Sequence, residues 1–254
     1  MKAVILAGGF AKRMWPLTEN QAKALLPVAD KPIINHILEK LEETEDVKDI
    51  FISTNEKFES QFREWLATVE TSKNLKLVVE CHDCEERKLG AIGGLKFLID
   101  KENIEDDLLI IGGDNLFEFN LKNFVGYCNG CRDPVVAFYD IGDIEKVRNK
   151  FGVALLDGNN YVQDFQEKPA EPKSTLISTC IYLIPREDLK LVDEYLTNDN
   201  NPDAPGFFFQ WLKDKKAIRG FVFDEKWFDV GSFELYDAAN KEFAEKIKDK
   251  NITI

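Results

Sequence analysis

Residues 1–28 read MKAVILAGGFAKRMWPLTENQAKALLPV, and this stretch decides the fold. It opens with the apolar run Ala3–Ala7, which is typical of a parallel strand that is buried on both faces. Gly8 and Gly9 follow at once, and because they lack a Cβ they let the backbone turn sharply and approach a ligand closely. The stretch therefore predicts a buried first strand that ends in a ligand-binding loop.

Three cations, Lys12, Arg13 and Lys23, follow the glycines within a short distance. Backbone N–H groups and guanidinium both favour phosphate oxygens, so the pattern is typical of a polyphosphate site. The P-loop pattern G-x-x-x-x-G-K-[ST] and the dinucleotide pattern G-x-G-x-x-G do not fit the stretch. We therefore expect a phosphate-binding loop of another kind, and a merely structural Gly-Gly turn is the alternative.

The composition of the 254 residues suits one large α/β domain, with 44% hydrophobic and 31% charged residues. The net charge is −13 and no Lys/Arg-rich block interrupts it, which argues against nucleic-acid binding. The first apolar run is too short for a signal peptide, and no stretch approaches about 18 apolar residues. We therefore expect a cytoplasmic protein without a membrane segment, whose cations are concentrated in a cleft. The oligomeric state stays open, a homo-oligomer included.

The first half of the chain alternates strands with amphipathic helices. After the first strand, strands are expected at 47–54, 75–79 and 108–111, and helices at 31–43, 56–69 and 90–100. This alternation predicts an α/β fold with a Rossmann-like, mixed and mainly parallel sheet that is flanked by helices. Ligands should lie beyond the carboxyl ends of the strands.

The second half is expected to extend the same sheet and to add a lid, so that residues 1–254 form a single domain. Its strands are predicted at 134–139, 152–156, 161–167, 178–184 and 217–223, and its helices at 186–196, 207–213 and 233–248. We find no linker, internal repeat or low-complexity tract between the halves.

The opening stretch resembles the signature of the sugar-1-phosphate nucleotidylyltransferases, in particular the glucose-1-phosphate thymidylyl- and uridylyltransferases. The family pattern is close to L-A-G-G-x-G-T-R-L-x-P-L-T, then P-K-x-L-x-P-V and K-P. This chain has LAGGFAKRMWPLT at 6–18, AKALLPV at 22–28 and KP at 31–32. Ala11 and Lys12 stand where the family usually has glycine and threonine. We expect the C-terminal β-helix that many members carry to be absent.

The resemblance implies an enzyme of NDP-sugar biosynthesis, a Mg²⁺-dependent nucleotidylyltransferase. It would condense a nucleoside triphosphate, dTTP or UTP by preference, with a sugar 1-phosphate, glucose 1-phosphate by preference, and release pyrophosphate. The nucleotide-binding part would be about 1–115, and the sugar-binding part and lid about 116–254. The nucleotide-binding residues it implies are Leu6, Gly8, Gly9, Arg13, Lys23 and Gly90, the last in Lys88–Gly94, which resembles the family's glycine-rich segment beside the base.

Two aspartates are implied as metal ligands. Asp114 follows the predicted strand 108–111, and Asp229 lies in Trp227–Gly231, which resembles the family's W-x-D-x-G. Two carboxylates and two phosphates suit Mg²⁺, which prefers hard oxygen ligands and is held by few carboxylates. An aspartate that merely caps a helix or sits in a turn is the alternative for Asp114.

The sugar-phosphate site is implied by Glu167-Lys168-Pro169, which resembles the family's E-K-P. Glutamate would hold sugar hydroxyls and lysine the phosphate, with further contacts from Asn115 and Gly152. Phe151 replaces the family's tyrosine before that glycine, and Cys180 stands where T-G-x-Y has its glycine. A surface Glu-Lys pair is the alternative reading of the motif.

The charge of the substrates implies the mechanism. A sugar 1-phosphate brings an anionic nucleophile, so attack on the α-phosphate needs no general base, and catalysis depends on positioning and electrostatics. The catalytic residues implied are Arg13 on the triphosphate, Lys23 near the reacting phosphate and Lys168 on the attacking phosphate. His36 and His82 have no role in this scheme.

Two C-x-x-C pairs, Cys81–Cys84 and Cys128–Cys131, raise the alternative of a four-thiolate zinc site. However, 43 residues separate Cys84 from Cys128, against roughly 15–20 in a zinc ribbon. The predicted layout also places Cys81 and Cys128 at opposite ends of the sheet. Reduced, incidental thiols are therefore the expectation.

Other functions compete on the same fold. A guanylyl- or cytidylyltransferase would act on mannose or heptose 1-phosphate or on phosphocholine, and the Glu167-Lys168 pair favours a sugar phosphate over phosphocholine. A non-catalytic regulatory subunit would be expected to lose the charged landmarks, which this chain keeps. A nicotinamide oxidoreductase fits only the α/β alternation, because its fingerprint is missing.

Overall fold

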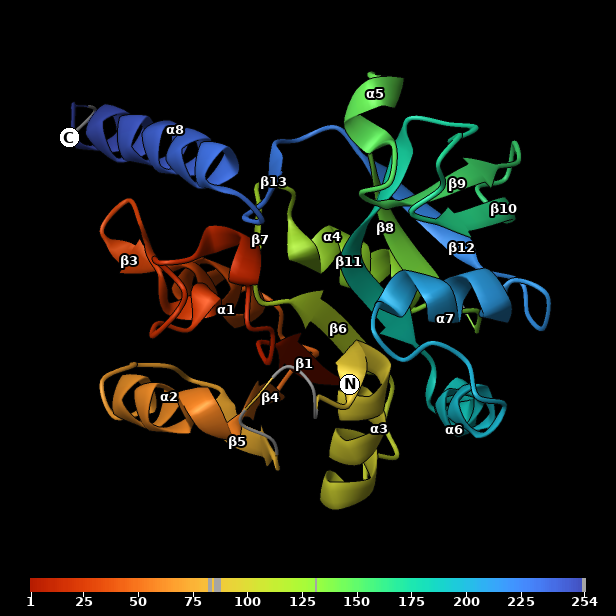
Figure 1. Cartoon of the computed structure of the whole chain (residues 1–254), viewed down its shortest axis with the longest axis horizontal. Coiled ribbons are helices and arrows are strands. Elements are labelled where there is room, and N and C mark those ends of the chain that lie inside the picture. The colour runs from red at the N-terminus through yellow and green to blue at the C-terminus, as the bar shows by residue number, and fades with distance from the viewer. Residues whose placement is uncertain (82–83, 85–87, 131, 253–254) are drawn as a thin grey trace.

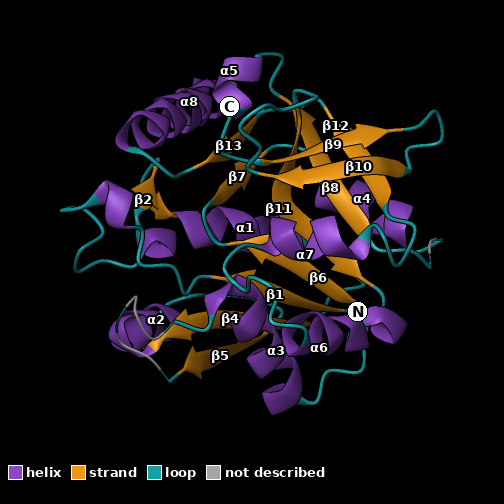
Figure 2. Ribbon diagram, turned by 45° about the vertical axis from the view of Figure 1, so that its right-hand side comes forward, coloured by secondary structure: helices purple, strands orange, loops and turns teal. Residues whose placement is uncertain are grey.

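The computed structural model describes residues 1–81, 84, 88–130 and 132–252, with the backbone alone for 247–252. One nine-stranded sheet runs through it in the order β10-β9-β11-β6-β1-β4-β5, and β8 joins β11 to β12. Helices cover both faces (Figures 1 and 2). In the described part of the chain, no helix combines the length and the apolar character needed to cross a membrane.

The parallel half of the sheet centres on β1, which pairs in parallel with both β4 and β6, while β5 continues from β4. Residues of β1 alternate between faces: Ala3 and Ile5 pack in one core, and Val4 packs in the other. The first core contains α1, α2 and α4, and the second contains α3, α6 and α7. These elements are β1 (Lys2–Leu6), β4 (Asp49–Asn55), β5 (Asn74–Glu80), β6 (Leu108–Gly112), α1 (Ile33–Glu42), α2 (Glu59–Leu66), α3 (Gly90–Glu102), α4 (Leu121–Cys128), α6 (Lys190–Thr197) and α7 (Pro205–Leu212).

The second half of the chain extends this sheet, mostly by antiparallel pairing. Strand β11 pairs antiparallel with β6, β8 and β9, and β10 pairs antiparallel with β9, whereas β12 runs parallel to β8. The predicted mixed α/β sheet is confirmed, and its parallel pairs are β1 with β4 and β6, β4 with β5, and β8 with β12. The added strands are β8 (Val135–Asp140), β9 (Gly152–Leu156), β10 (Val162–Glu167), β11 (Leu176–Ile184) and β12 (Arg219–Phe223).

A second, two-stranded sheet was not expected from the sequence. It pairs β7 (Asn115–Phe117) with β13 (Trp227–Asp229) in antiparallel register, so that Asp229 faces Asn115. Strands of three residues carry too little alternation to be recognised. This small sheet ties the end of the parallel half to the start of the last helix, α8 (Phe233–Ile252).

The remaining elements are short. They are η1 (Lys12–Met14), η2 (Lys23–Leu25), β2 (Pro27–Val28), β3 (Lys31–Pro32), η3 (Glu56–Phe58), α5 (Ile144–Val147) and η5 (Arg186–Asp188). The helix expected at 31–43 begins later, at Ile33, because residues 31–32 pair with β2.

Candidate active site

The glycine loop after β1 is held between the carboxyl ends of its two neighbouring strands. The N–H of Ala7 donates to the Ser53 carbonyl over 2.8 Å, and Asn55 Nδ2 donates to the Gly8 carbonyl over 2.8 Å. On the other side, the N–H of Gly113 donates to the Leu6 carbonyl over 2.9 Å. The loop is thus fixed at the edge where ligands of parallel sheets lie.

Ala11 keeps the backbone shape that the family's glycine would supply. Its φ is 47° and its ψ is 42°, which is left-handed helical conformation. Thr18 Oγ1 donates to the Ala11 carbonyl over 2.8 Å and supports the turn. A non-glycine residue in this region is strained by about 1–2 kcal/mol.

The small sheet brings Asp114 and Asp229 together. The N–H of Val230 donates to the Asp114 carbonyl over 3.0 Å, and Asp229 is the cross-strand partner of Asn115. Burial, with the neighbouring Asp114 carboxylate, raises the pKa of Asp229 to about 7. The structure therefore places the two predicted metal ligands side by side, as a carboxylate pair that favours a cation between them.

Lys23 neutralises part of this negative charge. Its Nζ donates to Asp114 Oδ2, and its side chain is 17% exposed. Burial opposes the charged ammonium, but the carboxylates of Asp114 and Asp229 outweigh it and raise the pKa of Lys23. Burial likewise opposes the Asp114 carboxylate, and Lys23 outweighs it and lowers the pKa of Asp114.

Arg13 lies on the exposed side of the same carboxylates. A Cβ added to Gly231 would stand 3.4 Å from Asp229 Oδ2 and 3.5 Å from an Arg13 guanidinium nitrogen. Gly231 thus lies beside both charged groups, at the point where they approach each other.

The side of the cleft where the resemblance implies the sugar phosphate, called the acceptor wall below, is built around Glu167, whose side chain is 6% exposed. Burial raises the pKa of Glu167, and the nearby Lys168 ammonium, 3.6 Å from Oε1, only partly offsets this. A Cβ at Gly206 would lie 1.7 Å from Glu167 Oε2, and one at Gly152 would lie 2.8 Å from it. Two glycines therefore make room for this carboxylate, and Lys168, with a φ of 48°, turns out of the strand beside it.

Asn115 is part of the same wall, and its side-chain oxygen already accepts a hydrogen bond from Trp227. Trp227 Nε1 donates to Asn115 Oδ1 over 2.6 Å, and the Phe151 ring packs edge-on against Trp227 with centroids 5.9 Å apart. Cys180 adopts a φ of 58° at a register shift of β11. The substituted glycine position therefore keeps a glycine-like backbone.

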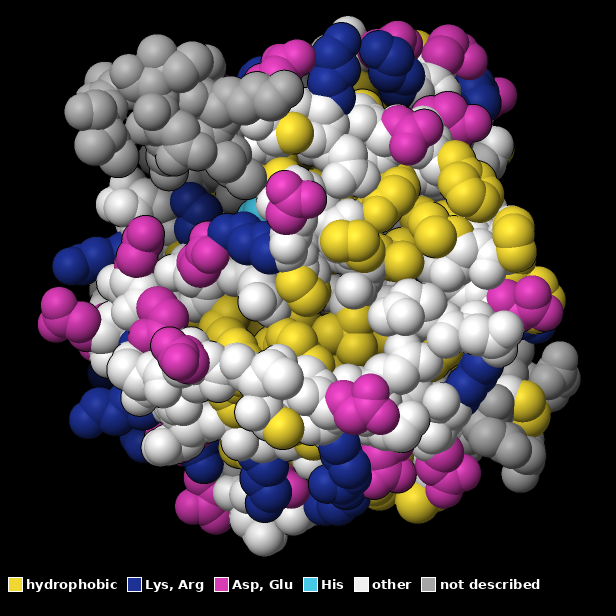
Figure 3. All heavy atoms as spheres, turned by 90° about the vertical axis from the view of Figure 1, so that its left-hand side faces the viewer, with side chains coloured by type: hydrophobic (Ala, Val, Ile, Leu, Met, Phe, Trp, Pro, Cys, Tyr) yellow, Lys and Arg dark blue, Asp and Glu magenta, His cyan; other side chains and the backbone are white. Residues whose placement is uncertain are grey.

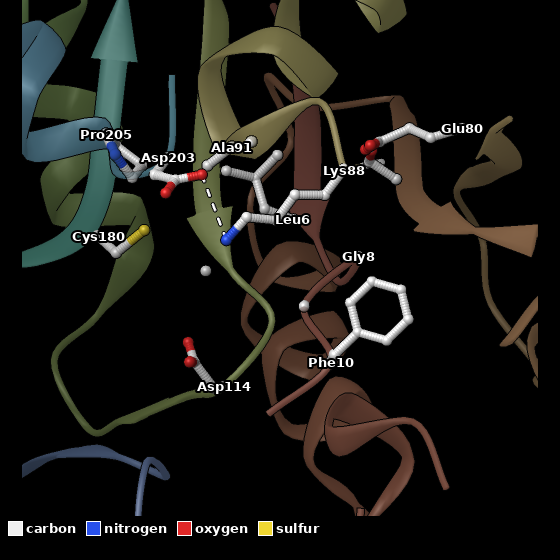
Figure 4. Close-up of a pocket in the computed structure, with 14 residues that line it drawn as sticks. Leu6, Gly8, Phe10, Glu80, Lys88, Ala91, Asp114, Cys180, Asp203 and Pro205 are labelled. Atoms are coloured by element: carbon white, nitrogen blue, oxygen red, sulfur yellow. Dashed lines mark hydrogen bonds and ion pairs between the residues drawn. The ribbon is translucent and has the colours of Figure 1, made fainter. Parts of the chain in front are cut away.

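Three adjoining pockets collect all the residues that the resemblance implied. The first pocket is lined by Leu6, Gly8, Gly9, Gly90 and Asp114. The second pocket is lined by Arg13, Asp114, Asn115, Gly152, Glu167, Lys168 and Asp229. The third pocket is lined by Arg13, Lys23 and Asp114, among others. Asp114 borders all three, so the pockets form one cleft with Asp114 at the junction. Figure 4 shows Asp114 at the edge of the first pocket.

Sequence reasoning missed several residues of the first pocket: Ser53, Glu80, Asp203 and Pro205. Lys88 Nζ lies 3.2 Å from an oxygen of Asp203, which ties the segment before α3 to the loop before α7. Glu80 ends β5 at the same sheet edge as the glycine loop, and that position was the signal that could have found it.

The face to the left in Figure 1 shows how local the positive charge is. Lys/Arg and Asp/Glu side chains are interspersed over it, and hydrophobic side chains lie in a hollow across its middle (Figure 3). No large field of one sign covers this face.

The cysteine pairs begin at opposite ends of the sheet. Cys81 follows the carboxyl end of β5 and is exposed, whereas Cys128 is buried at the end of α4. The next residue, Asn129, bonds Asp46 before the amino end of β4. Outside the described residues lie His82, Asp83 and Cys131. Within the described ranges, no group of three or more His, Cys, Asp or Glu side chains is placed to hold a metal ion.

Comparison with known proteins identifies the family. The family model described as "Nucleotidyl transferase" matches residues 2–246. The chain belongs to the nucleotidyl transferase family. The resemblance read from the glycine loop is thereby confirmed, and the chain is a member of a family of enzymes.

Curated relatives of this family member carry different names. The chain is 30% identical over 247 residues to a "Bifunctional protein GlmU" of Methanocaldococcus jannaschii, covering 97% of the chain and 55% of that protein. It is 29% identical over 244 residues to a "Putative mannose-1-phosphate guanyltransferase" of Sulfolobus acidocaldarius, covering 95% and 63%. The chain therefore spans little more than half the length of these relatives.

Solved structures agree on the fold. A putative glucose-1-phosphate thymidylyltransferase of Bacillus anthracis, in complex with a sucrose, superposes with a TM-score of 0.82 at 26% identity, covering 96% of this chain and 95% of that one. A UDP-glucose pyrophosphorylase complexed with UDP-glucose superposes with a TM-score of 0.79 at 19% identity, covering 96% and 98%.

Proposed function

We propose that the chain transfers a nucleotidyl group from a nucleoside triphosphate to a sugar 1-phosphate, giving an NDP-sugar and pyrophosphate. One observation carries the proposal: Asp114 and Asp229 meet where two pockets of the cleft join, with Lys23 and Arg13 beside them. A reaction between two polyanions needs such a junction of carboxylates and cations.

The two parts of the chain would divide the work. Residues 1–115 would hold the nucleotide through Leu6, Gly8, Gly9 and Gly90. Residues 116–254 would hold the acceptor, with Gly152 making room for Glu167 and with Asn115 at the boundary.

The residues of the chain would act by position and charge. Arg13 and Lys23 would hold the triphosphate and stabilise the charge that builds up on the leaving pyrophosphate. Lys168, which is 47% exposed and beside Glu167, would bind the attacking phosphate, and Glu167 would accept from sugar hydroxyls. The nucleophile is already anionic, so no residue has to remove a proton.

The carboxylate pair fits Mg²⁺. Asp114 and Asp229 supply two hard oxygen donors at one point, and their mutual repulsion favours a cation there. When bound, the ion would neutralise phosphate charge and orient the triphosphate.

The resemblance favours dTTP or UTP with glucose 1-phosphate, while a mannose-1-phosphate guanyltransferase stands among the relatives. The test is a pyrophosphate-release assay over a grid of nucleoside triphosphates and sugar 1-phosphates with Mg²⁺. We expect turnover with one pair and loss of it in the Asp114→Asn variant. A folded protein that is silent across the grid would contradict the proposal and favour a regulatory subunit.

A further inference from the structure

Glu80 is a buried carboxylate in the wall of the first pocket. It is the last residue of β5, is 7% exposed, and lines the pocket together with Gly8 and Ala91. Figure 4 shows it on the far side of the pocket from Asp114, with Gly8 between them. A nucleotide whose phosphates lie along the glycine loop toward Asp114 therefore extends its base toward Glu80.

The fold reserves a fixed place for this carboxylate. Ser53 Oγ donates to Glu80 Oε1 over 2.9 Å. A Cβ added to Gly94, inside α3, would lie only 2.3 Å from the same oxygen, and one added to Gly8 would lie 3.5 Å from it. Glycine in a helix interior is destabilising relative to alanine. At Gly94 this loss of helix stability is accompanied by the space that the Glu80 carboxylate occupies.

A carboxylate at this point discriminates among bases because an ionised carboxylate only accepts hydrogen bonds. Guanine presents two adjacent donors, N1–H and the 2-amino group, which match two carboxylate oxygens. Uracil and thymine present one N–H between two carbonyl oxygens, and both carbonyls would repel the carboxylate. Adenine and cytosine present one amino group beside a ring-nitrogen lone pair, which would also repel it.

We propose that Glu80 makes the nucleotide site selective for guanine, so that the donor substrate is a guanosine triphosphate and not UTP or dTTP. The inference rests on the proposed function for placing the base in the first pocket. Glu80 Oε1 accepts a hydrogen bond from Ser53 Oγ, and a carboxylate has about four lone-pair sites in all.

The test measures equilibrium binding of GTP, UTP and dTTP by calorimetry, without acceptor, to the full chain and to Glu80→Gln. We expect the unaltered chain to bind GTP at least about 10-fold more tightly than UTP, since hydrogen bonds to a charged group differ by that order. Glu80→Gln should lose about 10–100-fold in GTP affinity and gain affinity for UTP, because an amide N–H can donate to a pyrimidine carbonyl.

Two further variants sharpen the test. Asp203→Asn removes a different carboxylate of the pocket wall, one that pairs with Lys88, and should leave the ratio of GTP to UTP affinity within about twofold. Glu80→Asp keeps the acceptor and should retain a reduced preference for GTP, which covers the case in which Glu80→Gln does not fold.

Equal affinity for GTP and UTP, a preference for UTP, or a ratio unchanged by Glu80→Gln would overturn the inference. Turnover with UTP or dTTP in preference to GTP would overturn it and leave the proposed function intact. Selective GTP binding without turnover on any acceptor would leave it intact and contradict the proposed function.

Discussion

The two walls of the cleft are built by different means. The wall that we propose for the nucleotide, called the nucleotide wall, follows the parallel strands β1, β4 and β5, and its loop is shaped by glycines and by hydrogen bonds to its backbone. The acceptor wall comes from the antiparallel strands β9, β10 and β11, where Lys168 and Cys180 hold positive φ angles of 48° and 58°. The loop of the first wall offers backbone groups at Gly8 and Gly9, whereas the second wall offers the charged side chains of Glu167 and Lys168.

The difference shows where substrate choice resides. A loop of backbone N–H groups binds any triphosphate, so the nucleotide wall needs a side chain such as Glu80 to distinguish bases. The acceptor wall carries several polar and charged side chains, and two departures from the family pattern, Phe151 and Cys180, line it. Asp114 borders both walls and should therefore have the largest effect on turnover.

Asp114→Asn is expected to lower kcat by about 10²–10³-fold, the loss typical of one preorganised charged group. It would remove a metal ligand and the partner of Lys23 together. The measurement is pyrophosphate release at saturating substrates. Asp106→Asn, at a half-exposed position next to Lys2, is the matched control and should keep near-normal kcat. Comparable kcat values in both variants would contradict a role of Asp114 in the reaction.

Arg13→Ala is expected to lower kcat/KM by about 10²-fold, because Arg13 lines both the second pocket, proposed for the acceptor (the acceptor pocket), and the third pocket, proposed for the triphosphate (the triphosphate pocket). Lys12→Ala removes a neighbouring cation that lines only the triphosphate pocket, and it should cost less than about 10-fold. Both values come from initial rates with each substrate varied in turn. A larger loss for Lys12→Ala than for Arg13→Ala would show that Lys12, and not Arg13, stabilises the charge of the transition state.

The parallel half could be predicted closely because buried strands and glycine loops are local signals. The strand expected at 108–111 is β6, Leu108–Gly112, and the strand expected at 75–79 is β5, Asn74–Glu80. The spans expected for other elements differ at their ends by a few residues.

What the sequence could not predict depends on contacts between distant segments. The pairing of β7 with β13 places Asp229 opposite Asn115. Strands of three residues are too short for hydrophobic periodicity to predict this pairing. Only the family resemblance joined Asp114 to Asp229. Glu80 was missed because a glutamate at a strand end carries no motif, although its place at the carboxyl edge is informative.

Lys168→Met is expected to separate the two walls. It should raise the KM for the sugar phosphate by about 10-fold and leave the KM for the nucleotide within about twofold, because Lys168 lines only the acceptor pocket among those that meet at Asp114. Lys173→Met, which removes an exposed lysine paired with Asp164, is the control and should change neither KM. Equal increases in both KM values would show that Lys168 serves the whole cleft.

Ala11→Gly tests the one place where the nucleotide wall resembles the acceptor wall, a non-glycine residue at a φ of 47°. Relief of about 1–2 kcal/mol of left-handed strain should exceed the roughly 0.4–1 kcal/mol that glycine adds to the entropy of the unfolded chain. The Tm should therefore rise by roughly 1–4 °C in a thermal melt. Ala67→Gly, at a φ of −71° after α2, relieves no strain and should lower the Tm.

Because Thr18 holds the turn through the Ala11 carbonyl, the loop should keep its shape in Ala11→Gly and kcat should stay within about threefold. A fall in Tm in both variants would show that the backbone at Ala11 is not strained.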